Sequence, residues 1–358
     1  MNSSVLERAR RGDERAFEEL TTPHLSELRL HCYRMLGSSD DADDLLQETL
    51  AAAWRGLPDF AGRSSPRSWL YRIATNHCLN AIRQSKRRPV VVPAPPFHPP
   101  EPSRRGDVAW LQPYPDAWLE QLPDTAPPPA DRLELRESVE LAFIAALQRL
   151  PPRQAAALIL CDVLGFSMAE VAGMLDTTPT AVKGALQRAR TTLERQRGAA
   201  PGEVPAPNAE SERKLARRFA AAFTEGDVDG VVALLTDDAW LAMPPAPHEY
   251  VGQRAVAAFL RASAEWRTAS RFQLLPTRAN LQPAFGCYFH EAGTAHPAGI
   301  IVLSLGGGAI RTITRFLDGR LNSKFDLPGA AAILTAEALG HGDIDPRCGF
   351  RPIQNSPR

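Results

Sequence analysis

The sequence of 358 residues has no apolar run approaching the roughly 20 residues that a membrane-spanning helix needs. Its first residues, MNSSVLERARRGDERAFEEL, contain no apolar signal-peptide core, so we expect a cytoplasmic protein with no membrane partner. The cysteines are scattered without a C-x-x-C pair: Cys32, Cys78, Cys161, Cys287 and Cys348. This spacing supports neither a metal site nor a disulfide framework and predicts buried, reduced thiols.

No Ser-His-Asp, Cys-His or metal-ligand constellation is visible, so the sequence specifies no reaction, and we expect no cofactor. Net charge is also absent, because 41 basic residues balance 41 acidic ones. The charges are nevertheless segregated. Residues 55–88 contain eight Lys or Arg and one acid, whereas residues 37–50 contain five acids and no Lys or Arg. These opposite local fields predict two different polar partners, one of them nucleic acid.

The chain is long enough for two or three domains. Thirteen prolines in the 42 positions of residues 89–130 disfavour regular structure there and predict an extended linker. In the C-terminal extension we expect a helix over Ala330–Leu339 and a loose tail. The predicted blocks are helices over 1–88, the linker 89–130, helices over 131–197, a second linker 198–208, an α+β domain over 209–328 and the extension 329–358.

Residues 151–195 show the pattern of a helix-turn-helix. Ser167 and Glu170 form an S-x-x-E capping box that starts a helix near Met168, and Thr178-Pro179 starts a second one. Asp176 in the turn tolerates a left-handed conformation. This geometry lays a basic second helix in a DNA major groove, while the alternative is an ordinary helical hairpin in a core. The residues expected to face outward are Thr180, Lys183, Gln187, Arg188 and Arg190.

Two earlier segments have helical periodicity and charged outer faces. In residues 40–55 the acids lie off the apolar stripe, which suits either a solvated surface or a helix that docks on a basic protein. In residues 66–88 the basic and amide side chains of Arg72, Asn76, Arg83 and Arg87 lie opposite the apolar stripe. Such a face fits backbone tracking and base contact on unpaired DNA, and the alternative is an ordinary surface helix.

In the C-terminal block, helical patterns come first and a run of strands follows, which favours an α+β fold over a doubly wound sheet. Asp237-Asp238 stands between a helix and a strand, which predicts a turn. The expected helices are 210–225, 228–235 and 253–267, and the expected strands are 240–243, 272–275, 285–290, 299–305 and 309–317.

Three segments resemble regions 2 and 4 of bacterial sigma-70-type factors of the extracytoplasmic-function group: DADDLLQETLAAAW, SPRSWLYRIATNHCLNAIRQSKRR and LPPRQAAALILCDVLGFSMAEVAGMLDTTPTAVKGALQRAR. The resemblance covers about residues 5–196 and implies two all-α DNA-binding domains that act with the RNA polymerase core. The linker would then thread the polymerase channels, where its negative charge mimics RNA.

The same resemblance assigns roles to particular residues. The recognition helix would read the −35 duplex, and Asn76 and Asn80 would capture a flipped base of the single-stranded −10 element. The full −10 set is Arg72, Asn76, Asn80, Arg83 and Arg87. The residues implied to bind the β′ clamp helices of the polymerase are Asp40, Asp43, Asp44, Gln47 and Glu48.

DDAWLAMPPAPHEYVGQRAVAAFL and IRTITRFLDGRL resemble the SnoaL-like, cone-shaped nuclear-transport-factor superfamily. That fold implies a cavity for a small-molecule ligand, lined by Trp240, Met243, Tyr250, Phe259, Tyr288 and Phe316. Some members of the superfamily are enzymes that use pocket Asp, Arg or Tyr. The candidates here are Asp237, Asp238, Tyr250, Arg254, Arg278 and Tyr288.

We expect the last domain to be a ligand sensor or an intramolecular regulator of a sigma factor. Two alternatives stay open: a sigma factor fused to an active small-molecule enzyme, and a ligand-responsive repressor that binds operator DNA as a symmetric dimer. The 66–88 helix distinguishes the last of these, because a repressor needs no second helix for single-stranded DNA.

Overall fold

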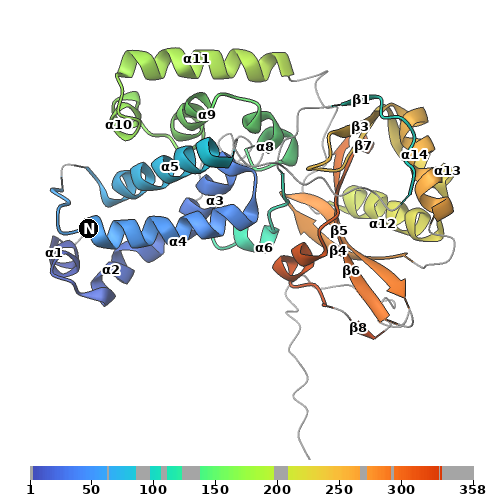
Figure 1. Cartoon of the computed structure of the whole chain (residues 1–358), viewed down its shortest axis with the longest axis horizontal. Coiled ribbons are helices and arrows are strands. Elements are labelled where there is room, and N and C mark those ends of the chain that lie inside the picture. The colour runs from blue at the N-terminus through green and yellow to red at the C-terminus, as the bar shows by residue number, and fades with distance from the viewer. Residues whose placement is uncertain are drawn as a thin grey trace, which may run out of the picture.

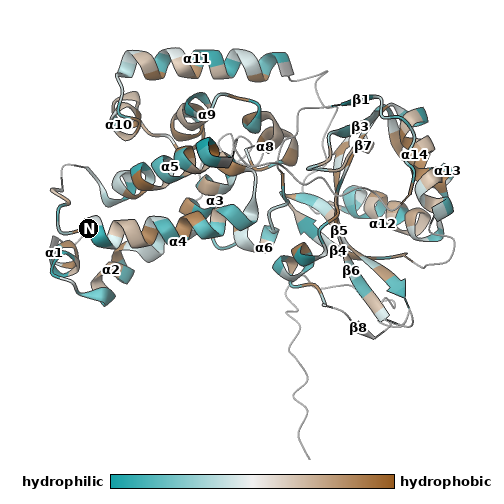
Figure 2. Cartoon of the chain, viewed as in Figure 1, coloured by the Kyte–Doolittle hydropathy of each residue, from teal (hydrophilic) through white to brown (hydrophobic). Residues whose placement is uncertain are grey.

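The computed structural model of the chain describes residues 3–62, 64–85, 97–105, 111–122, 138–196, 209–266, 272–291, 294–329 and 331–332. The two helical domains lie together on one side of the molecule, and a sheet with its own helices lies on the other (Figure 1). Apolar residues concentrate on the inward faces of the helices and strands (Figure 2). Residues of all three parts share one apolar core, and we call this packed arrangement the closed structure.

The N-terminal helical domain is built around α3, α4 and α5, whose apolar stripes form one core. Gly37 ends α3 in the left-handed conformation, and the Ser38 hydroxyl caps α4 by accepting a hydrogen bond from the Asp41 amide. Its elements are α1 (Ser3–Arg10), α2 (Glu14–Thr21), η1 (Thr22–His24), α3 (Leu25–Leu36), α4 (Ser39–Gly56) and α5 (Pro66–Ser85).

The helix-turn-helix domain confirms the local sequence signals. Ser167 and Glu170 form the complete capping box at the start of α10, and the turn places Asp176 at a φ of 50°. Thr178 caps α11 by accepting from the Ala181 amide. The elements are α8 (Leu141–Gln148), α9 (Pro152–Leu158), the π-helical turn η2 (Ile159–Val163), α10 (Met168–Met174) and α11 (Pro179–Gln196).

The C-terminal domain has the expected α+β class. One face of its sheet packs on α12 and α14, and the other face contributes Ile300, Val302 and Phe316 to the core of the helical domains. Its elements are α12 (Glu210–Glu225), α13 (Val228–Val232), β2 (Leu235–Ala242), β3 (His248–Val251), α14 (Gln253–Trp266), β4 (Phe272–Ala279), β5 (Gln282–Glu291), β6 (Thr294–Gly306), β7 (Ala309–Phe316), η4 (Gly319–Phe325) and β8 (Ala331–Ala332).

The strand order is β1-β3-β2-β7-β6-β5-β4, with β8 paired to β6. The pair β2–β7 is parallel, and the other described pairs are antiparallel. Three sequence expectations were wrong. The short strand β3 was missed, Asp237-Asp238 lies within β2 at a register shift instead of in a turn, and residues 331–332 form a strand instead of a helix. The remainder of the expected helix 330–339 lies outside the described residues.

The proline-rich linker was expected to lack regular structure, and in its described parts this is wrong. Arg104–Arg105 form strand β1, which pairs with β3, and Asp116–Leu119 form helix α6, which packs on α3. Neither residue of β1 is a proline, so both can pair with the edge strand β3. Partners far away in the sequence therefore order a segment whose composition alone predicts none.

The turn between β4 and β5 joins all the domains. Asn280 there is fully buried at a φ of 57°, a conformation that asparagine tolerates. Its amide nitrogen donates to the Tyr33 hydroxyl at 2.9 Å and to the Val139 carbonyl at 2.7 Å. Its amide oxygen accepts from the Tyr114 backbone amide at 2.9 Å. One side chain thus binds the N-terminal domain, the linker and the residue run leading into α8.

Asn280→Ala should lower the free energy of unfolding by about 3 kcal/mol, because it removes these bonds and leaves buried polar groups unpaired. Asn280→Gly is the matched control, since it keeps the positive φ while losing the same bonds. Urea unfolding and small-angle scattering would be measured on both. A wild-type midpoint with wild-type dimensions for both variants would show that the turn is dispensable.

Asp116 accepts hydrogen bonds from the Leu281 amide at 2.8 Å and from Arg278 Nε at 3.1 Å. Burial raises the pKa of Asp116 to about 6. The folded protein therefore binds more protons than the unfolded chain between pH about 4 and 6. Folding stability consequently falls as the pH rises through that window.

Asp116→Asn cannot titrate. Relative to this variant, the wild type should lose roughly 3 kcal/mol of stability between pH 4 and 7. Each unit of difference between the folded and unfolded pKa of Asp116 contributes about 1.4 kcal/mol. Thermal unfolding at a series of pH values would measure the difference, with the exposed Asp44→Asn as control. Parallel pH profiles of wild type and Asp116→Asn would contradict the assignment.

Candidate functional site

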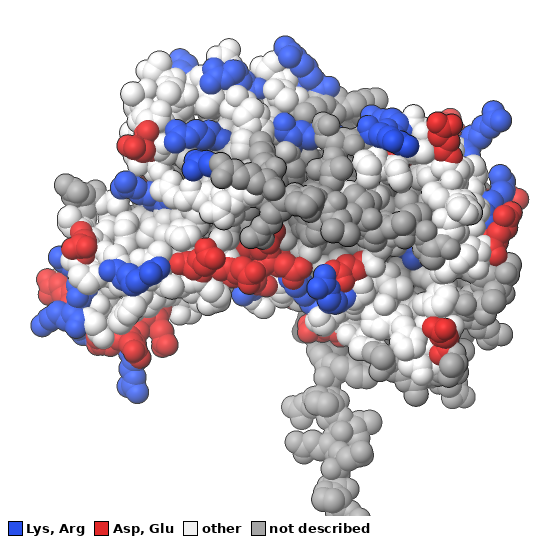
Figure 3. Space-filling model, in the orientation of Figure 1, with Lys and Arg blue, Asp and Glu red and all other residues white. Residues whose placement is uncertain are grey.

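The acidic side chains of α4 lie in one band on the molecular surface (Figure 3). Four of the five predicted docking residues, Asp40, Asp44, Gln47 and Glu48, are exposed, and Asp43 is half-buried. Asp43 Oδ1 forms an ion pair with Arg29 Nε at 2.9 Å. The apolar stripe of α4 is buried, as its periodicity predicts. The helix therefore presents a continuous acidic face.

One cation from the C-terminal domain contacts this acidic face. Lys324 of η4 places its Nζ 2.6 Å from Asp40 Oδ1 and 4.0 Å from Asp43 Oδ2. Burial acts to raise the pKa of Asp40, but hydrogen bonds from Lys324 and Gln112 prevail and lower it. At Asp43 burial prevails and raises the pKa. Sequence reasoning missed Lys324, because nothing local to it indicates a partner 280 residues upstream.

Gln112 of the linker is buried, and its side chain caps the N-terminus of α4. Its Oε1 accepts from the Ser38 hydroxyl, the Ser39 hydroxyl and the Asp40 amide at 3.0–3.2 Å. Its Nε2 donates to Asp40 Oδ2 at 2.7 Å. These bonds satisfy orphan groups at the helix N-terminus. No local signal marks Gln112, since it stands among prolines without periodicity.

The outward face of α5 is exposed as predicted. Arg72, Asn76, Asn80 and Arg83 are all exposed, and Arg83 donates to Asn80 Oδ1 at 3.3 Å. Arg87 lies outside the described residues. Basic and amide groups thus line one accessible side of a long helix, where they can contact phosphates and base edges.

Recognition helix α11 buries Val182, Leu186 and Ala189, and it exposes all five predicted DNA-contacting residues. Four of these, Thr180, Lys183, Gln187 and Arg188, make no ion pair with another described residue. Arg190 differs, because its guanidinium forms two hydrogen bonds with the Asp162 carboxylate at 2.9 and 2.7 Å. These bonds fasten α11 to η2 and occupy a group that was expected to contact DNA.

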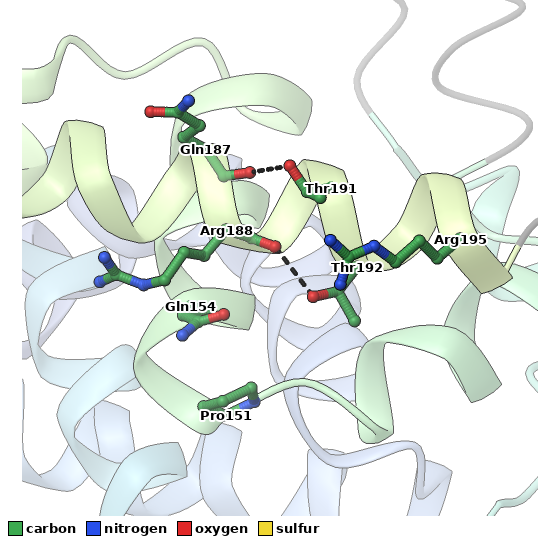
Figure 4. Close-up of a pocket in the computed structure, with 7 residues that line it drawn as sticks. All are labelled: Pro151, Gln154, Gln187, Arg188, Thr191, Thr192 and Arg195. Carbon is green, nitrogen blue, oxygen red and sulfur yellow. Dashed lines mark hydrogen bonds between the residues drawn. The ribbon is translucent and has the colours of Figure 1, made fainter.

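A groove of about 440 Å³ lies between α11 and the start of α9. Arg188 extends from α11 on the side where Gln154 lies, and the hydroxyls of Thr191 and Thr192 bond back to α11 carbonyls (Figure 4). Sequence reasoning missed Arg195 at the other end of this groove. Spacing of seven from Arg188 places both on one face of the helix. The lining residues are Pro151, Gln154, Gln187, Arg188, Thr191, Thr192 and Arg195.

The residues predicted to line a cavity in the C-terminal domain divide between two faces of the sheet. Met243 and Tyr250 belong to the core beneath α12 and α14. Phe316 belongs to the core on the opposite face of the sheet, where the Tyr288 hydroxyl donates to the Pro328 carbonyl at 2.6 Å. Trp240 is half-buried with the Arg104 guanidinium 4.3 Å above its ring. The sixth predicted residue, Phe259, lies in the same core as Met243 and Tyr250, with its ring centroid 4.7 Å from that of Tyr250.

The polar residues considered as catalytic groups are also dispersed. Asp237, Asp238 and Arg254 are exposed. Arg278 pairs with Asp116 and Glu212 between the linker and α12. The hydroxyl of Tyr250 donates to the Pro100 carbonyl at 3.0 Å. The contacts of Arg278 and Tyr250 join the C-terminal domain to the linker.

Among the described residues, no group of three or more His, Cys, Asp or Glu is placed to hold a metal ion. Within the same part of the chain, no helix combines the length and apolarity needed to cross a membrane.

Comparison with known proteins identifies the family. The Sigma-70 region 2 model matches residues 20–88, the Sigma-70, region 4 model residues 140–193, and the SnoaL-like domain model residues 216–283. Over 323 residues the chain is 41% identical to the ECF RNA polymerase sigma factor SigG of Mycobacterium tuberculosis, which covers 89% of this chain and 85% of that protein. The chain belongs to the ECF RNA polymerase sigma factors.

The similarity extends to other sigma factors. ECF sigma factor SigM of M. tuberculosis is 32% identical over 197 residues, covering 55% of this chain and 85% of that protein. The crystal structure of the extracytoplasmic function sigma factor SigJ of M. tuberculosis has a TM-score of 0.55 at 21% identity. It covers 88% of this chain and 100% of that one, and it shares the fold. This alternative sigma factor is therefore a transcription initiation factor with a SnoaL-like domain.

Alanine at Gln187 or Arg188 should cost this sigma factor about 1–3 kcal/mol of −35 duplex affinity and relax preference at one base pair. Lys183→Ala should weaken binding to all duplex sequences by the same factor, as expected for the loss of a phosphate contact. Fluorescence anisotropy on duplexes selected from a random library, at several salt concentrations, would measure both effects.

Arg190→Ala and Asp162→Ala form a matched pair. Because each removes the same ion pair, they should lower the melting temperature of the helix-turn-helix domain by similar amounts. Their charge changes are opposite, so Asp162→Ala should not weaken binding to the DNA polyanion. The double variant Arg190→Ala/Asp162→Ala keeps the net charge, so a loss of DNA affinity in it relative to wild type would show that Arg190 contacts DNA directly.

Proposed function

We propose that this sigma factor binds the polymerase core in the cytoplasm through the acidic face of α4, which docks on the β′ clamp helices. In the same proposal, α5 holds the single-stranded −10 element and α11 reads the −35 duplex. The observation that carries these assignments is that all three predicted faces are exposed on one molecule. Exposure argues against a core hairpin, and the match to Sigma-70 regions 2 and 4 favours these roles over ordinary surface helices.

We also propose that the C-terminal domain regulates the sigma factor by holding it closed. The Asn280 bonds support this role, as does the apolar core that the sheet shares with the helical domains. The helical domains also contact each other directly, since the Ser68 hydroxyl of α5 donates to Glu170 of α10 at 3.2 Å. In this arrangement the separation of α5 and α11 is fixed, so promoter binding that needs another separation requires opening.

The closed arrangement affects the polymerase face more than the DNA faces. Lys324 engages Asp40 and Asp43 of α4, while the outer residues of α5 and α11 stay exposed. Regulation would therefore act on polymerase binding. A catalytic role for the C-terminal domain is less supported, because the relatives are sigma factors and the polar candidates make structural contacts.

Lys324→Ala should raise affinity for the polymerase core two- to five-fold, because it frees Asp40 from an ion pair that is exposed only at the carboxylate and is worth about 1 kcal/mol. Asp44→Lys with Glu48→Lys should lower that affinity by more than tenfold, because the substitutions reverse the charge of the docking face. Core binding by surface plasmon resonance and run-off transcription would measure both.

Two matched controls accompany these variants. Arg320→Ala removes another η4 cation, whose ion pair with Asp318 is local. Glu7→Lys with Glu18→Lys reverses two exposed charges on α1 and α2. Both controls should behave like wild type. Normal core binding by the Asp44/Glu48 variant would reject the docking assignment, and unchanged binding by Lys324→Ala would reject shielding by the C-terminal domain.

A further inference from the structure

Residues 97–105 of the linker run along the open edge of the C-terminal sheet. Arg104 and Arg105 pair with Glu249 and His248 of edge strand β3. The Ser103 hydroxyl accepts from the Val251 amide, and the Pro100 carbonyl accepts from the Tyr250 hydroxyl, both at 3.0 Å. The segment thus adds to the sheet in the way that an extended peptide binds an exposed edge.

The segment begins with an aromatic side chain that enters a group of rings. Phe97 stacks on Trp266 with 6.1 Å between ring centroids, and it contacts Phe259 at 5.5 Å. Trp266 stacks in turn on Phe289 at 5.7 Å with an angle of 19° between the rings. We call Phe259, Trp266 and Phe289 the ring site. Phe97 of the linker fills this site, although the residues that form it belong to the C-terminal domain.

The ring site is only partly covered. Trp266 is 41% exposed even with Phe97 stacked on it, and Val251 beside the segment is also 41% exposed. Met168 is the other large apolar residue that stays exposed in the described part of the chain, and it lies in the helix-turn-helix domain. Two of three exposed apolar side chains therefore flank residues 97–105. Ring stacking recognises flat apolar shape, so another planar ring can replace Phe97.

We propose that the ring site binds a planar, apolar aromatic small molecule, and that this ligand competes with Phe97 and releases residues 97–105 from β3. The proposal rests on the regulatory role proposed above for the C-terminal domain, and it names the class of ligand that this domain would bind. Release would also break the ion pair of Arg104 with Glu249. Glu249 also lies 3.8 Å from Arg149, just after α8, so release leaves this carboxylate paired with Arg149.

The probe for the test is N-phenyl-1-naphthylamine, a neutral aromatic dye that fluoresces when it leaves water. In wild type the tethered Phe97 competes with it, so apparent affinity is reduced by the fraction of molecules with an open site. Phe97→Ala should bind the dye about tenfold more tightly, and Trp266→Ala should lose that binding. The peptide FHPPEPSRR, added in trans, should displace the dye from Phe97→Ala.

A reversible lock tests competition without removing Phe97. Arg105 and His248 are opposed in the β1–β3 ladder, where Cα atoms lie about 4.5–5.5 Å apart, within disulfide range. Oxidised Arg105→Cys/His248→Cys should bind the dye at least tenfold more weakly than the same protein reduced. Single-cysteine variants control for oxidation, and Met168→Ala controls for dye binding to exposed apolar surface.

Equal dye affinity in wild type, Phe97→Ala and the oxidised lock overturns the proposal, as does undiminished binding by Trp266→Ala. These binding measurements need no polymerase, so they do not depend on the regulatory role. Transcription with the core enzyme tests that role separately. The dye should stimulate wild type and leave the oxidised lock unchanged. Dye binding without stimulation would overturn the release step and the proposed regulation together, while the affinity series would still establish the site.

Discussion

The closed structure depends on how the buried amide of Asn280 is satisfied. An unpaired polar group in a protein interior is costly, and this side chain finds its partners on Tyr33, Tyr114 and Val139, in segments that lie far apart in the chain. No single domain can supply those partners. The turn that carries Asn280 is therefore fully hydrogen-bonded only when the N-terminal domain, the linker and the approach to α8 surround it. Separation of the domains exposes this site to water and must replace all three bonds.

Local features of the fold were predictable because their causes lie within a few residues. Ser167 and Glu170 are three positions apart and cap the same turn, and Asp176 tolerates its left-handed conformation without outside help. The exposed faces of α5 and α11 follow from helical periodicity alone. The linker was different. Its prolines correctly disfavour a long helix, but composition contains no information about the edge of β3, which is about 145 residues away in the sequence.

The candidate site divides in the same way. Segregated charge in the sequence predicts the acidic face of α4, whereas the cation that meets it, Lys324, belongs to a domain that follows at the other end of the chain. The residues expected to line a cavity are divided between two sheet faces for a related reason. The fold resemblance places aromatic residues near a cone, but the face on which each side chain lies depends on strand register, and a shift by one residue reverses it. Tyr288 and Phe316 alternate with neighbours that enter the other core.

The relative sizes of the contacts indicate which of them controls opening. The Lys324–Asp40 ion pair is half-exposed at its carboxylate, and surface pairs of this kind contribute about 1 kcal/mol or less. The Asn280 bonds and the shared apolar core are buried, so their loss costs several times more. Neutralising Lys324 therefore adjusts access to α4 without opening the protein. Opening needs a partner with differential affinity for the open state, and under the proposed docking on α4 the polymerase core is such a partner. A ligand that releases residues 97–105 would act on the same equilibrium between the closed and open states. It would do so at the β3 edge of the sheet, opposite the β4 edge that carries Asn280, by removing contacts that only the closed state makes.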